Sequence, residues 1–159
     1  MKIIFKISVI FSILFLLIFI SCKKYPEGPC ISFRSAKSRI YGDHMLTVLT
    51  DNGVDELSQY YDSLGTGFQF NYDDFSKVDA CSIHGETKLG WSSDLVWTWD
   101  LTNDNKILKI TSSGGYRPSW GPFGTNILPE WEILRLTKKE IKLKTTYNGK
   151  EYDISLKAK

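Results

Sequence analysis

Alternation of apolar and polar residues is the main pattern of this chain. In one segment the side chains of Leu95, Trp97, Trp99 and Leu101 share a face. The same two-residue period recurs in residues 141–147 and again in residues 152–156. Such one-sided alternation is typical of an antiparallel sheet with one buried and one solvated face.

The pattern predicts eight short strands, at residues 39–50, 67–72, 78–83, 95–102, 107–111, 131–136, 141–146 and 152–156. Asn148-Gly149 predicts a two-residue hairpin, because both central positions of that turn need positive φ. We expect one helical turn over residues 34–39 and a helical or irregular connection over residues 54–64.

An all-β fold follows, since the chain has no long amphipathic helix of the kind that βαβ folds need. Eight short meandering strands favour an up-and-down antiparallel β-barrel, which closes on itself and so leaves no exposed edge. A β-sandwich is the alternative.

The N-terminus is typical of an exported protein. Lys2 and Lys6 precede an apolar run over residues 7–20, which is shorter than the roughly 20 residues of a membrane-spanning helix. The run ends at Ser21-Cys22, which resembles a bacterial lipobox. We therefore predict a lipoprotein signal peptide at residues 1–21, a lipid on Cys22, and a tether over residues 22–30 before the barrel domain at residues 31–159.

The acyl chains on Cys22 would hold the protein on a membrane at about 0.8 kcal/mol per buried methylene. Lys23 follows Cys22, and by analogy with enterobacterial lipoproteins this favours the outer membrane, facing either the periplasm or the cell surface. A signal anchor and an ordinary cleaved secretory peptide are the alternatives.

Charge excludes one class of partner. The chain has 20 Lys and Arg against 18 Asp and Glu, and removal of Lys2 and Lys6 with the signal peptide makes the remainder neutral. A neutral domain lacks the basic excess that nucleic-acid binding requires. It also lacks the cationic face that would hold it on an anionic membrane by charge alone.

Two cysteines remain after Cys22. Outside the cytoplasm Cys30 and Cys81 are candidates for a disulfide, which would close a long loop. The other interpretations are two free thiols, or a metal site in which Cys30, Cys81, His84 and His44 are the ligands. We predict no metal and no other cofactor.

Catalytic signatures are missing from the sequence, which has no nucleophile elbow, zinc-binding helix motif or phosphate-binding loop. We therefore expect a non-enzymatic protein.

Trp97 and Trp99 are candidate ligand-binding residues, and so are four residues of the glycine- and proline-rich segment 112–124. Aromatic rings bury a large area at small entropic cost, and an arginine beside them stacks or pairs with a carboxylate. These four residues are Tyr116, Arg117, Trp120 and Phe123. The structural alternative is that the aromatic residues fill the core.

Several features in order resemble small lipocalin-like lipoproteins of Bacteroidota. After the lipobox and tether come the segment 31–42, the turn Asn52-Gly53-Val54-Asp55, the strand Trp97-Thr98-Trp99, the strand 131–136 and a last hairpin carrying Tyr152. The family implies an antiparallel barrel with an interior cavity and no common ligand. It usually has tryptophan where this chain has His44, so another tryptophan such as Trp131 would have to close that end.

The function that follows is binding of a small apolar or amphipathic molecule by a membrane-anchored lipocalin-like barrel. The alternative is a structural lipoprotein of the envelope that binds an unidentified partner protein through its exterior.

Overall fold

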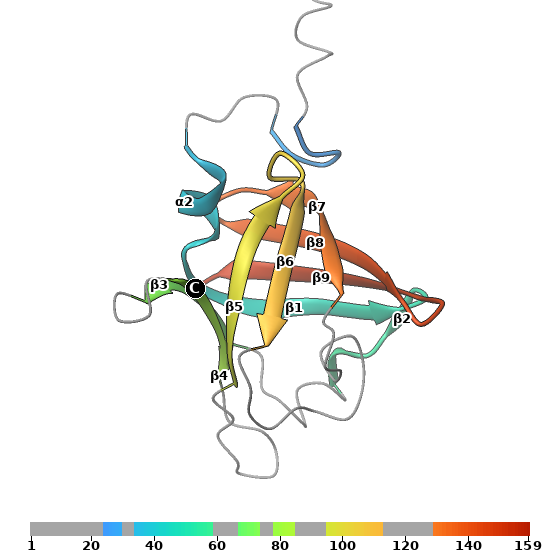
Figure 1. The fold of residues 1–159 in the computed structure, drawn as a ribbon. Coiled ribbons are helices and arrows are strands. Elements are labelled where there is room, and N and C mark those ends of the chain that lie inside the picture. Colours follow the sequence, from blue (N-terminus) through green and yellow to red (C-terminus); the bar gives the residue numbers. More distant parts are fainter. Residues whose placement is uncertain (1–23, 30–33, 59–66, 74–77, 85–94, 113–128) are drawn as a thin grey trace, which may run out of the picture.

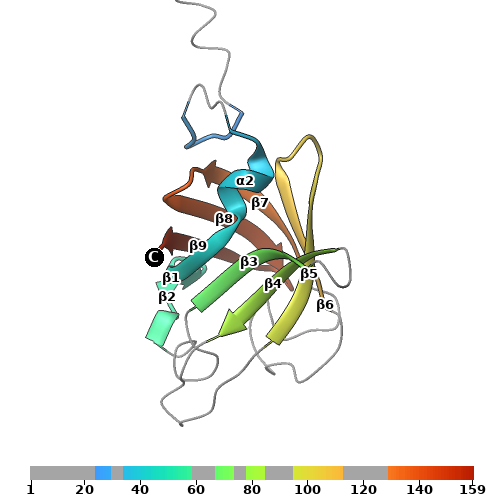
Figure 2. The same cartoon turned by 90° about the vertical axis from the view of Figure 1, so that its left-hand side faces the viewer.

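The structure, a computed structural model, describes residues 24–29, 34–58, 67–73, 78–84, 95–112 and 129–159. One antiparallel sheet dominates it and curls until its first long strand pairs with its last (Figures 1 and 2). The strands are β1 (Gly42–Asp51), β2 (Val54–Asp55), β3 (Gly67–Asp73), β4 (Val78–His84), β5 (Leu95–Thr102), β6 (Ile107–Ser112), β7 (Glu130–Leu136), β8 (Glu140–Tyr147) and β9 (Lys150–Ala158).

The predicted up-and-down barrel is confirmed. β1 and β3 to β9 form a closed ring of eight strands, and β2 is an extra short strand paired with the end of β1. All eight predicted strands are present. The largest difference is at the start of β1, where the short helix α2 (Ala36–Ile40) includes Arg39 and Ile40. β2 lies in the connection that was expected to be helical or irregular.

Turn chemistry agrees with the sequence. Asn148 and Gly149 have φ angles of 51° and 77°, so they form the predicted two-residue hairpin between β8 and β9. Asn52 and Gly53 adopt a similar pair of angles, 50° and 80°, between β1 and β2. Because these angles suit asparagine and glycine, the two hairpins fix the register of the strands that they join.

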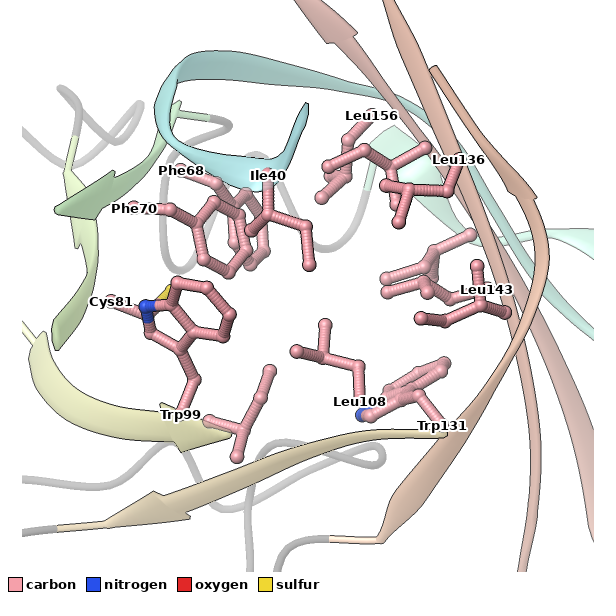
Figure 3. Packing of buried hydrophobic residues seen from close by; sticks show 14 of the residues in the cluster. Ile40, Phe68, Phe70, Cys81, Trp99, Leu108, Trp131, Leu136, Leu143 and Leu156 are labelled. Carbon is pink, nitrogen blue, oxygen red and sulfur yellow. The ribbon is translucent and has the colours of Figure 1, made fainter. Parts of the chain in front are cut away.

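The core lies inside the ring and is built from the inward-facing side chains of the strands. Figure 3 shows aromatic residues from β3 and β5 facing aliphatic residues from β7, β8 and β9. The largest side chains with almost no exposed surface are Trp97, Trp131, Tyr25, Phe68, Phe70, Ile40, Leu49 and Leu108.

One end of the barrel is closed by α2 and the chain just before it (Figures 1 and 2). Ser35 caps α2, its side-chain oxygen accepting a hydrogen bond from the Ser38 amide at 3.2 Å. Ile40 at the end of the helix has no exposed surface. The guanidinium of Arg39 donates to the Leu136 carbonyl on β7 at 2.9 Å, which joins the helix to the rim.

Residues 24–29, which the sequence analysis placed in a tether, are packed on this closed end. Tyr25 is a core residue, 1% exposed, and its hydroxyl donates to the Asn105 carbonyl at 3.0 Å. The Glu27 amide donates to the Leu134 carbonyl at 2.8 Å, and the Glu27 carboxylate pairs with Lys142 at 2.7 Å. The folded domain therefore begins by Lys24, earlier than residue 31.

Trp131 has no exposed surface and lies on β7. It is opposite Leu108, which is itself opposite Leu101, one residue before β5 ends. This level is toward the closed end, and the replacement of the family's tryptophan by Trp131 stays a prediction. No helix in the described ranges has the length and apolar character needed to cross a bilayer.

Candidate functional site

Trp97 and Trp99 point into the barrel from β5. Trp97 lies opposite Cys81 on β4, and Cys81 lies opposite Phe70 on β3. All four side chains are at most 3% exposed. The structure therefore places the two predicted tryptophans in the interior, on an apolar wall that spans three neighbouring strands.

Trp99 is held from several sides. Its ring meets Tyr41 and Phe70 edge to face, with centroid distances of 5.6 Å and 5.8 Å. Its indole N–H donates to the Ala80 carbonyl at 3.0 Å, and the Lys37 ammonium lies 5.8 Å from its ring centroid. These contacts hold Trp99 in place, and Trp97 lies further from the closed end on the same strand; their role as ligand-binding residues stays a prediction.

Cys81 is fully buried and forms no disulfide with any other described residue. Burial in the apolar wall raises its pKa, because the thiolate would be desolvated there. Its predicted disulfide partner, Cys30, lies outside the described residues, so the pairing stays a prediction.

His44 is buried inside the closed end. Its Nε2–H donates to the Ile40 carbonyl at 2.8 Å, and its ring lies edge to face with Phe70 at 5.8 Å. Nδ1 is also buried and has no hydrogen-bond partner in the described part of the chain. Burial lowers the pKa of His44, and the carbonyl of Ile40 offsets this only in part.

This burial predicts loss of stability in mild acid. The unfolded chain takes up a proton on His44 near pH 6.5, and the folded chain does so only at lower pH. As the pH falls through about 6.5, we therefore expect this group to lower the free energy of unfolding. Urea titrations of the wild type and of His44→Gln measure the difference, and parallel pH profiles would contradict the prediction.

The strand ends far from α2 include the end of β4, the start of β5, the end of β6 and the start of β7. This follows because successive strands alternate in direction from Gly42, which comes directly after the helix segment. The connection over residues 113–128 joins two of these ends. Four predicted ligand-binding residues belong to it and lie outside the described residues: Tyr116, Arg117, Trp120 and Phe123.

A groove of about 510 Å³ is lined by residues of α2, β4, β5 and β6. Lys37 of α2 lies at its edge, with its ammonium 2.5 Å from Asp79 and 3.7 Å from Asp100. The lining combines charged, hydroxyl and apolar side chains: Lys37, Val78, Asp79, Thr98, Trp99, Asp100, Lys109 and Thr111.

Asp79 is held as a carboxylate. Burial opposes its charge, but hydrogen bonds from Lys37 and from the Tyr41 hydroxyl lower its pKa overall. The same hydrogen bond raises the pKa of Lys37. Because the hydrogen bond between them favours the charged form of both groups, Lys37 and Asp79 form an ion pair that joins α2 to β4.

The described residues include no group of three or more His, Cys, Asp or Glu side chains that could bind one metal ion together. The alternative metal site also involved Cys30 and the side chain of His84, which the structure does not describe.

No protein-family model matches the chain, and no curated protein matches it either. The site must therefore be interpreted from its own chemistry.

Tyr25 and the pair formed by Lys37 and Asp79 were not predicted from the sequence. Tyr25 lies between lysines and a Pro-Glu-Gly-Pro run, and the lysine–aspartate pair joins residues 42 positions apart. An isolated aromatic residue in a polar segment was the one available indication for Tyr25, since such a residue usually packs against something.

Proposed function

We propose that this protein is a lipocalin-like lipoprotein that is held on the outer membrane through Cys22 and binds a small apolar or amphipathic molecule without catalysing a reaction. The closed barrel with an aromatic inner wall is the observation that carries the proposal. Barrels of eight strands are of the size that encloses side chains or one small ligand.

Because one end of the barrel is covered, a ligand would have to enter from the opposite end. α2, Tyr25 and Ile40 cover one end, and the hydrogen bond from Arg39 to the Leu136 carbonyl fastens that cover. The opposite strand ends are joined by the segment that holds Trp120 and Phe123. A ligand would enter there and meet Trp97 before Trp99.

The proposal predicts one saturable site for a fatty acid. The probe is cis-parinarate, whose fluorescence is excited by energy transfer from a nearby tryptophan. Titrating it into the detergent-extracted full chain should give sensitised emission that saturates at one molecule per chain and that palmitate displaces.

A matched pair of variants locates the probe. Trp97→Phe should lower the sensitised emission more than Trp131→Phe, which is changed near the closed end, because energy transfer falls steeply with distance. Emission that rises without saturation, or that falls equally in both variants, would count against an interior site.

A second function is favoured by apolar side chains on the outside of the barrel. Met45 and Val48 on β1 and Val54 on β2 are 43%, 40% and 61% exposed. Such residues suit an envelope lipoprotein that binds a partner protein. Absence of any saturable parinarate site would favour this alternative.

A further inference from the structure

The position of Tyr25 limits how far the barrel can lie from a lipid on Cys22. Only three residue steps separate Cys22 from Tyr25, and an extended chain spans about 3.3–3.6 Å per residue. Tyr25 is fixed in the core and by its hydrogen bond to the Asn105 carbonyl. The closed end therefore lies within about 10 Å of the anchored residue. This distance is close to the Debye length at physiological salt, so charges at this end are not fully screened from the membrane surface.

Basic side chains gather at this same end. The anchored segment lies between two hairpins, because Lys24 pairs with Asp104 of the β5–β6 hairpin and Glu27 pairs with Lys142 on β8. Figures 1 and 2 show both hairpins, α2 and residues 24–29 at one end of the molecule. Four exposed basic residues of this end have no acidic partner among the described residues: Arg34, Lys106, Lys138 and Lys139.

The hairpins farther from this end have the opposite charge. The β1–β2 and β8–β9 hairpins carry four acidic residues against one lysine: Asp51, Asp55, Glu56 and Glu151, with Lys150 paired to Asp51. Net neutrality of the domain therefore conceals a separation of charge, with the basic part nearest the predicted anchor.

We infer that the closed end is a membrane-facing surface, whose lysines contact anionic phospholipid headgroups while the opposite strand ends face away from the bilayer. We call Lys106, Lys138 and Lys139 the basic end. A lysine near an anionic surface strengthens binding about fivefold. The inference rests on the proposed anchor for its geometry and on the basic end for its chemistry.

The test measures the depth of two matched positions in the lipidated full chain. Asn103 in the β5–β6 hairpin and Asn148 in the β8–β9 hairpin are both exposed and have φ angles of 50° and 51°, so a cysteine costs the same at each. Asn103→Cys and Asn148→Cys, made with Cys30→Ser, are labelled with a fluorophore. The chains are then placed in vesicles of equal parts phosphatidylglycerol and phosphatidylcholine, with a headgroup nitroxide as quencher.

We expect strong quenching at position 103 and weak quenching at position 148. Equal quenching, or stronger quenching at 148, would overturn the orientation. Changing the basic end to glutamine should reduce quenching at 103 in these vesicles and leave it unchanged in pure phosphatidylcholine.

A control with the same net charge separates the surface from overall charge. Lys109, Lys144 and Lys150 are paired with acids on the barrel wall and the far hairpin. Changing these three to glutamine should leave quenching at 103 unchanged, and an equal loss would overturn the role of the basic end.

Failure of the anchor has a different result. Both labelled chains would then wash off the vesicles. Added back to fresh anionic vesicles, the chains still test whether the basic end contacts the headgroups. Quenching at position 103 alone would support that contact, and quenching at neither position would overturn it.

Discussion

Replacing Trp99 with alanine should lower the free energy of unfolding by about 3–5 kcal/mol. The indole is 3% exposed, packs against Tyr41 and Phe70, and donates its N–H to the Ala80 carbonyl. Alanine would leave a cavity inside the ring and leave that carbonyl without its indole donor. Since small domains are stable by about 5–15 kcal/mol, this change alone brings the barrel near its unfolding limit.

Trp99→Phe is the matched control for this prediction. It keeps an aromatic ring against Tyr41 and Phe70 and loses the hydrogen bond, so it should cost about 1–3 kcal/mol. Urea unfolding followed by circular dichroism measures both variants. A cost for alanine below that for phenylalanine would contradict the role assigned to Trp99.

Replacing Cys22 with alanine should remove the mature lipid-bearing form. The thiol is the proposed attachment point, and two or three acyl chains provide nearly all of the membrane affinity of a neutral domain. In a detergent phase separation we expect the mature-size chain of the wild type in the detergent phase and none of the variant there. Uncleaved precursor, which keeps the apolar run of residues 7–20, is distinguished by its greater mass.

Cys30→Ala provides the control for the Cys22 prediction, because it also removes a thiol from the N-terminal region. It should leave the distribution between the phases as in the wild type. A Cys22→Ala chain of mature size that still enters the detergent phase would contradict lipidation at this residue.

The strands could be predicted from the sequence because their causes are local. Trp97 and Trp99 share a face by the two-residue period alone, and Asn148-Gly149 sets its hairpin by its own φ angles. Closure of the sheet into a ring could also be predicted, because eight strands with one solvated face have few other ways to avoid exposed edge strands.

The contacts that close the barrel end could not be predicted, because they join distant residues. Tyr25 reaches Asn105 across 80 positions, and Arg39 reaches Leu136 across 97. Nothing near Tyr25 in the sequence distinguishes a docked segment from a free tether. The Pro and Gly residues around it suit a sharp turn on a surface as well as a linker.

The separation of charge between the two ends of the barrel could not be predicted from the sequence, because it also depends on residues that are distant along the chain. Lys106 and Lys138 are 32 positions apart and are brought to one end by two hairpins that the strand order places together. Composition reports only the total, which is neutral.

The mass of the first mature peptide is the most direct measurement of the central claim, that this barrel is fixed to a membrane by its own N-terminus. Protein extracted from membranes, digested and analysed by mass spectrometry should yield a peptide that begins at Cys22 and carries glyceryl-linked acyl chains. A peptide that begins at another residue, or one in which Cys22 is unmodified, would contradict the account.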